Sequence, residues 1–113
     1  MSASPVRFLP ALALVLAAAA PAPAQAPTGF QLAIKDHRFS PADLRLPAHQ
    51  PAWLEVANQD AQPEEFECKP LGIEKVIPAG SRARFRVRPL QPGRYAFVGE
   101  YHEATTRGVL VVD

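Results

Sequence analysis

The chain has 113 residues, a length that fits one domain and is too short for two. Its 12 Lys and Arg residues balance 11 Asp and Glu residues to a formal net charge of +1, which excludes a strongly basic nucleic-acid binder and an acidic tail. The 13 prolines and 6 glycines favour a turn-rich β domain over a helical bundle, and one cysteine excludes an intrachain disulfide and a cysteine-based zinc or iron–sulfur site.

The N-terminal residues have the pattern of a secretory signal peptide. Arg7 supplies a positive region, Phe8–Ala20 is an apolar run too short to span a bilayer, and small residues follow at signal-peptidase spacing. Cleavage after Ala24 is preferred over cleavage after Ala26. The apolar run is not followed by a cysteine that could carry a lipid, so no membrane anchor is expected. We predict a removed signal peptide at 1–24, a short flexible linker at 25–29 and an exported domain at 30–113.

Short strands separated by turn residues make up the rest of the chain. Apolar and polar residues alternate from Phe30 to Ile34 and around Leu44 and Leu46, with a turn at Asp36–Pro41 between them. Apart from one possible turn near Leu71, no helical period persists. Further strands are expected around Ala52–Val56, Glu64–Cys68, Ser81–Arg88, Tyr95–Val98 and Val109–Val112. This pattern predicts an all-β Greek-key sandwich of about seven strands.

The closing residues resemble the end of a cupredoxin, where a Tyr-x-Phe-x-Cys strand leads to a ligand His, a Met and a final strand. Gly93–Phe97, His102 and Gly108–Val111 follow that order. Gly99 stands where the copper-ligating Cys belongs, and Arg107 falls about where the axial Met would be. The resemblance implies a cupredoxin-type sandwich with a degenerate type 1 copper site.

The details are more similar to the cupredoxin-like proteins of bacterial periplasmic ferrous-iron uptake systems. The similarity covers nearly the whole mature chain and rests on Asp36–Pro41, Glu65–Glu67, Glu74–Val76, Pro89–Leu90 and Glu100–His102. It implies a periplasmic location and two partners, a periplasmic iron/copper-binding protein and an oxidase-dependent iron permease. Cys68 departs from the small hydroxyl residue expected after Glu-Phe-Glu.

The missing thiolate determines the copper chemistry that is expected. A blue-copper centre needs a Cys ligand, which Gly99 cannot supply. Cys68 shares strand parity with Phe66 and is therefore expected to point into the core as a structural thiol. We expect a bound iron or copper ion of uncertain identity and no blue-copper centre.

Nitrogen and oxygen donors remain as candidate ligands. His102 and Glu100 lie two residues apart on the loop that carries metal ligands in the resembling fold. Glu65 and Glu67 share one face of a strand, and His37 is added from the turn that follows the first strand. Imidazole and carboxylate suit Fe(II), Fe(III), Mn(II) or Cu(II). For the two strand carboxylates the alternative is a structural role beside a lysine or an arginine, and both remain open.

Four arginines alternate along one predicted strand, namely Arg82, Arg84, Arg86 and Arg88. Like charges at this spacing repel one another, so they need carboxylates across the sheet or an acidic partner. An open solvated face and a docking face are both consistent with the pattern. Nucleic acid is excluded as the partner by export and by the balanced charge.

Three functions follow from these observations. The preferred one is a periplasmic metal-binding component of an oxidase-dependent ferrous-iron importer, as the resemblance implies. A second is oxidation of Fe(II) by the protein itself, for which the sequence shows no second metal site or electron acceptor. A third is a metal-free module that docks through the arginine row.

Overall fold

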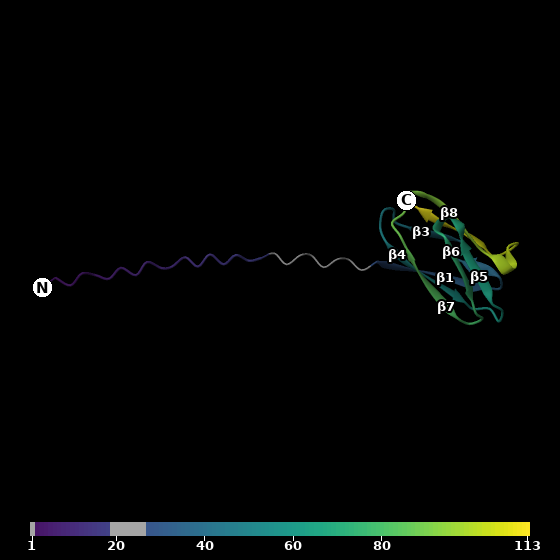
Figure 1. Cartoon of the computed structure of the whole chain (residues 1–113), viewed down its shortest axis with the longest axis horizontal. Helices are drawn as coiled ribbons and strands as arrows, with labels where there is room; N and C mark the ends of the chain where they lie inside the picture. The colour runs from purple at the N-terminus through teal and green to yellow at the C-terminus, as the bar shows by residue number, and fades with distance from the viewer. Residues whose placement is uncertain (1, 19–26) are drawn as a thin grey trace.

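The computed structural model describes residues 2–18 and 27–113 (Figure 1). Residues 2–18 form no helix or strand, and their apolar side chains are exposed, with Phe8 at 90% and Leu12 at 91%. Within the described ranges, no helix has the length and apolar character needed to cross a membrane. The expected cleavage positions, Ala24 and Ala26, lie outside the described residues, so the signal peptide stays a prediction.

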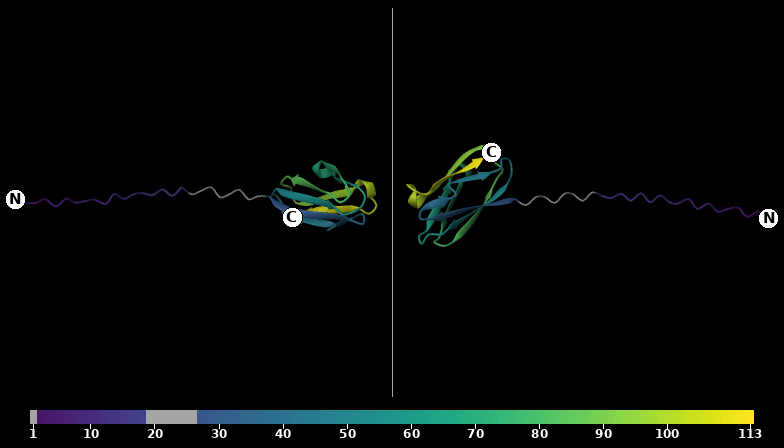
Figure 2. Two further views of the ribbon diagram at one scale, coloured as in Figure 1. Left: turned by 90° about the horizontal axis from the view of Figure 1, so that it is seen from below. Right: turned by 180° about the vertical axis from the view of Figure 1, so that it is seen from behind.

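The described residues form nine strands in two mixed sheets that pack face to face (Figures 1 and 2). One sheet has the order β2-β1-β4-β7 and contains β1 (Thr28–Lys35), β2 (Arg38–Ser40), β4 (Ala52–Asn58) and β7 (Arg82–Val87). The other has the order β3-β9-β8-β5-β6 and contains β3 (Asp43–Leu46), β5 (Glu64–Cys68), β6 (Ile73–Ile77), β8 (Gly93–Gly99) and β9 (Arg107–Val112). Two short 3-10 helices complete the fold, η1 (Lys69–Leu71) and η2 (Glu100–His102).

Alternating apolar residues build the core between the sheets. In β4, for example, every second residue from Ala52 to Asn58 is buried, as period-two alternation predicts. Three aromatic rings meet at the centre of the sandwich, where Phe39 lies edge-on to Phe97 at 4.8 Å and to Phe66 at 5.9 Å between ring centroids. The predicted all-β sandwich is confirmed.

The structure has nine strands where about seven were predicted, and its first strand begins before residue 30. β2 lies within the expected turn and is only three residues long, whereas β6 is an edge strand whose residues are mostly exposed, so neither shows a clear alternation. β1 begins at Thr28 rather than at residue 30, because Thr28 and Gly29 pair with Ala52 and Trp53 of β4. The predicted linker therefore extends into the first strand.

The two faces of strand β5 carry side chains in different environments. Glu64, Phe66 and Cys68 are buried on the core side, and the exposed fraction of Cys68 is 1%. Burial raises the pKa of the Cys68 thiol, which agrees with the inward, structural position predicted for it. Glu65 and Glu67 take the other face, so consecutive glutamates enter different environments.

Candidate metal site

The five predicted ligands fall into two groups in the structure. Glu65 and Glu100 lie together in a cluster of carboxylates, with Glu67 beside them. His37 and His102 instead stack on each other at the end of the sandwich that carries η2. The prediction of one site with imidazole and carboxylate ligands is therefore divided between two neighbouring places.

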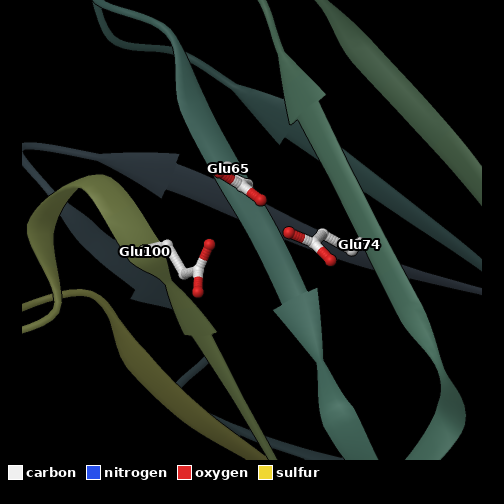
Figure 3. Close-up of side chains that lie close together, drawn as sticks. All are labelled: Glu65, Glu74 and Glu100. Atoms are coloured by element: carbon white, nitrogen blue, oxygen red, sulfur yellow. The ribbon is translucent and has the colours of Figure 1, made fainter.

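Glu65, Glu74 and Glu100 form the first group. One carboxylate oxygen from each residue lies within 4.8 Å of the other two. Figure 3 shows the three side chains turned toward one another, with Glu65 on β5 between Glu74 on β6 and Glu100 on η2. Oxygen ligands converging from three separate elements can hold a hard cation.

Glu67 lies beside this group, and the hydrogen-bonding capacity of its carboxylate is only partly used. Its residue is 8% exposed, and its Oε2 has no hydrogen-bond partner among the described residues. Its other oxygen, Oε1, lies 3.9 Å from Lys69 Nζ, at the limit of an ion pair. Glu67 also pairs across the strands with Glu74, and like charges directly opposite each other destabilise a sheet. A buried carboxylate oxygen without a partner is costly, and a bound cation would remove that cost. We call Glu65, Glu67, Glu74 and Glu100 the carboxylate cluster.

The electrostatics of the cluster favour a bound proton or cation. The neighbouring Glu74 carboxylate and then desolvation raise the pKa of Glu65 above its ordinary value of 4.5, and they outweigh Glu100, which lowers it. The neighbouring Glu100 carboxylate likewise raises the pKa of Glu67, with desolvation as the next cause. The folded protein therefore holds these protons more strongly than the unfolded chain does, because the ionised carboxylates repel one another.

The second group contains two imidazoles and a buried carboxylate. The rings of His37 and His102 are stacked, with centroids 3.6 Å apart and planes inclined by 18°. His102 Nδ1 is hydrogen-bonded to Glu64 Oε2. Glu64 Oε1 accepts the N–H groups of Tyr101 at 2.9 Å and of Glu65 at 3.2 Å. Glu64 is only 2% exposed, yet both of its oxygens are satisfied.

A tight turn holds His37 in place. Asp36 and His37 have positive φ angles of 51° and 56°, as a two-residue hairpin turn of type I′ requires, although neither is glycine. Asp60 stabilises the turn by accepting the Asp36 N–H at 2.7 Å and the His37 N–H at 3.0 Å. Burial acts to raise the pKa of Asp60, but these backbone donors outweigh it and lower the pKa below 3.8. Thr106 adds a hydrogen bond from its hydroxyl to the carbonyl oxygen of His37 at 2.7 Å.

Gly99 leaves the space that Glu64 fills. A Cβ atom at position 99 would lie 2.6 Å from Thr106 Cγ2 and 2.7 Å from Glu64 Cδ, too close for either contact. A thiolate therefore does not fit at this position while Glu64 is present. Cys68 lies four residues along β5 from Glu64, which corresponds to roughly 13 Å of strand. The residues of this region do not fit a type 1 copper centre.

Two residues of the candidate site, Glu64 and Glu74, were not predicted from the sequence. Glu64 has the same strand parity as Phe66, so parity alone could have placed it inside, beside the end of β8. Glu74 belongs to a matching motif but lies on a strand that was not predicted. The separation of Glu100 from His102 also has a simple cause, since residues two apart in a 3-10 helix point about two-thirds of a turn away from each other.

The outward placement predicted for the arginine row is seen for three of its four members. Arg82 is paired with Glu55 on β4, with 3.0 Å between Nη1 and Oε1. Arg84 and Arg86 lie over the Trp53 ring, with guanidinium carbons 5.0 Å and 5.8 Å from its centroid. The prediction was wrong for the fourth, Arg88. β7 ends at Val87, and the Arg88 side chain turns to the carbonyl oxygen of Pro70 at 3.4 Å.

One family model and one similar protein sequence match most of the chain. A family model described as a cupredoxin-like domain matches residues 8–112. An uncharacterized protein, RP394, of Rickettsia prowazekii (strain Madrid E) is 32% identical over 83 residues, which cover 74% of this chain and 66% of that protein.

Solved structures share the fold at low identity. The metal-binding domain of the Cu(I)-exporting P-type ATPase CopA of Streptococcus pneumoniae D39 has a TM-score of 0.67 at 18% identity, covering 75% of this chain and 84% of that domain. Auracyanin B has a TM-score of 0.65 at 16% identity, covering 80% of this chain and 92% of its own. A copper-binding protein in its apo form has a TM-score of 0.65 at 17% identity, covering 75% and 86% respectively. Since the family model covers all nine strands, the chain belongs to the family of cupredoxin-like domains.

Proposed function

We propose that this protein binds an iron or copper ion at the carboxylate cluster and serves as a periplasmic component of an oxidase-dependent ferrous-iron uptake system. The observation that carries the proposal is the unpartnered Oε2 of the buried Glu67, beside three carboxylates that converge within 4.8 Å. A cation placed among these oxygens would neutralise their repulsion and give Glu67 its missing partner.

The donor set favours hard or borderline cations. Carboxylate oxygens suit Fe(III), Fe(II), Mn(II) and Mg(II), whereas Cu(I) prefers sulfur. Two of the structurally similar proteins are described as bound to Cu(I) or as copper-binding, which supports a metal-handling role in general. In this chain the thiolate position is a glycine, so the supporting chemistry is that of oxygen and nitrogen ligands.

Membership in an iron uptake system is supported by motif order. The matching segments occur in both sheets and in η2, and three of them supply Glu65, Glu74 and Glu100 to one place. The partners in this proposal are a periplasmic iron/copper-binding protein and an iron permease, with the signal peptide directing export.

The imidazole pair is a second candidate for a metal position. Glu64 is hydrogen-bonded to Nδ1 of His102, and among the described residues nothing bonds to its Nε2. A histidine held by a carboxylate through one nitrogen, with the other nitrogen available, is the usual arrangement of a metal-ligating imidazole. His37 is stacked on the same ring, so a borderline ion such as Cu(II) could bind here rather than at the cluster.

Calorimetric titration with Fe(II) and Mn(II) under anoxic conditions tests the proposal. The Glu65→Gln/Glu74→Gln variant should lose about tenfold or more in affinity, because two of the converging ligands lose their charge. Glu55→Gln/Glu103→Gln removes the same charge outside the cluster and should bind as the wild type does. Equal affinities in both variants would contradict the cluster as the site.

Two further measurements separate the alternatives. If the imidazole pair is the site, His102→Ala should abolish binding while the cluster variant has no effect. Oxygen consumption on addition of Fe(II) distinguishes an oxidising protein from one that only binds the metal.

A further inference from the structure

The outer face of the four-stranded sheet carries a concentration of positive charge. Strand parity and pairing place five cations there, with one carboxylate, that of Glu55, at the outward positions of the same strands. The cations are Lys35 on β1, Arg38 on β2, and Arg82, Arg84 and Arg86 on β7. We call these five residues, together with Trp53, the basic face. Its excess charge contrasts with a net charge of only +1 for the whole chain.

Most of these cations lack a carboxylate partner. Among the described residues, Arg82 is the one member of the basic face with a carboxylate within 4.0 Å. Arg84 and Arg86 lie against the flat indole of Trp53, which orders the guanidinium groups without neutralising them. Their N–H donors are therefore available to an anionic group from outside.

Small residues leave hollows beside the arginines. Ala33 and Ala57 line a hollow of about 240 Å³ with Arg82 on its wall. Gly29 and Trp53 line a second one of about 140 Å³ next to Arg84. Glu55 also lines both hollows, and its charge is paired with Arg82. A carboxylate from outside therefore finds its unpaired cation in the hollow beside Arg84.

These features favour a protein partner over a lipid surface. In the folded part of the structure, the large apolar side chains that are exposed are Val76 on β6 and Tyr101 on η2, and neither lies on the basic face. A surface that inserts into a bilayer presents exposed apolar side chains beside its cations, and this one does not. Hollows also fit protruding side chains better than a planar array of headgroups.

We propose that the basic face docks onto a carboxylate-rich surface of a partner protein. Acidic side chains would bind the guanidinium groups of Arg84 and Arg86 in the bidentate manner that arginine allows, one of them from the hollow beside Arg84, while Arg82 keeps its pair with Glu55. Such a complex would leave the opposite sheet, which carries the carboxylate cluster, uncovered. The docking does not depend on metal binding, so it can be tested separately.

The test uses an oligoglutamate peptide and the fluorescence of Trp53, which is the one tryptophan in the chain. Arg84→Gln/Arg86→Gln should weaken peptide binding about tenfold, because the two unpaired guanidinium groups of the basic face lose their charge. The matched control, Arg45→Gln/Arg94→Gln, removes the same charge from the outer face of the five-stranded sheet and should change affinity by less than about twofold. Binding to the wild type should weaken as salt rises.

Three results would overturn the inference. Equal losses of peptide affinity in the two double variants would show that binding depends on net charge and not on the basic face. Stronger binding to phosphatidylglycerol vesicles than to the peptide would assign the face to a membrane. Dimerisation at low salt that is lost in Arg84→Gln/Arg86→Gln would make it an interface between copies of this chain.

Discussion

The carboxylate of Glu64 and those of the carboxylate cluster lie in opposite hydrogen-bonding environments. Glu64 is deeply buried, but it receives hydrogen bonds from two backbone N–H groups and contacts an imidazole nitrogen. The next residue, Glu65, faces Glu74 and Glu100. A satisfied carboxylate holds the fold together, whereas a proton or a cation relieves the repulsion between carboxylates that face one another. Burial alone therefore does not distinguish a structural glutamate from a candidate ligand; the presence or absence of hydrogen-bond donors does.

The two regions are joined through η2. Glu64 holds this helix by its contacts with Tyr101 and His102, and the helix carries Glu100 into the cluster. A substitution at Glu64 should therefore shift the position of Glu100 in the carboxylate cluster. A substitution within the cluster should leave the hydrogen bonds of Glu64 unchanged.

The largest expected effect is on protein stability, for a substitution at Gly99 beside Glu64. Gly99→Ala should destabilise the protein by about 3 kcal/mol, because the new Cβ would overlap Glu64 and Thr106 in a packed region. Gly29→Ala is the matched control, since a Cβ there meets nothing within 4 Å. Chemical denaturation measures both variants. Equal stability in the two would show that Glu64 does not occupy the space beside Gly99.

Glu64→Gln should have the next largest effect. The amide loses the charge-assisted hydrogen bond to His102 and directs an NH2 group toward existing donors, at a cost of about 2 kcal/mol. Glu103→Gln, at an exposed position in the same region, should change stability by less than about 0.5 kcal/mol. Thermal unfolding of both variants checks the prediction, and a neutral Glu64→Gln would contradict the structural role of this carboxylate.

Glu67→Gln should act in the opposite direction on metal-free stability. Its amide can donate to Glu74 or Glu100, so the stability of the metal-free protein should rise or stay unchanged, while metal affinity falls several-fold. Denaturation and calorimetric titration of the same sample measure the two quantities. Loss of stability with unchanged affinity would assign Glu67 to the scaffold, in partnership with Lys69.

The pH dependence of stability provides a smaller effect with a defined sign. The raised pKa values of Glu65 and Glu67 mean that the folded state binds more protons than the unfolded state above pH 4.5. Metal-free stability should therefore increase as pH falls from neutrality toward 4.5, and Glu65→Gln/Glu67→Gln should remove that increase. The lowered pKa of Asp60 has the reverse sign, so its contribution is lost only as pH falls below 3.8. Denaturation over this pH range would contradict the account if stability fell steadily from neutrality.

The smallest expected effect is on the spectrum with Cu(II). Without a thiolate ligand, the visible spectrum should contain only weak ligand-field bands, and Cys68→Ala should leave it unchanged. An intense blue colour that disappears in Cys68→Ala would place the buried thiol on the metal and refute its structural assignment.

Strand alternation allowed much of the fold to be predicted. β4 and β7 alternate clearly because one face of each is buried, and the three outward arginines of β7 were read correctly from that pattern. β6 escaped detection because an edge strand exposes Glu74, Lys75 and Val76 together. The alternation of apolar and polar residues reflects which side chains are buried, and burial is least regular in the edge strands of a sheet.

The candidate site was predictable only in part. The sequence placed Glu65 and Glu67 on one face, and the structure agrees. Which residues approach them depended on how η2 turns and on the pairing of β5 with β6, and neither is local to the motif. Glu64 was overlooked because its partner, His102, lies 38 residues away in the sequence.

Paramagnetic broadening by Mn(II) tests the central claim most directly, because it locates the cation relative to the two regions. The account predicts that substoichiometric Mn(II) first broadens the backbone amide signals of β6, at Glu74 and Val76, together with that of Glu65. Signals from the turn at Asp36 and His37 should persist at the same Mn(II) concentration. Broadening that begins at His37 and Thr106 while β6 is unaffected would place the metal at the imidazole pair and contradict the assignment to the carboxylate cluster.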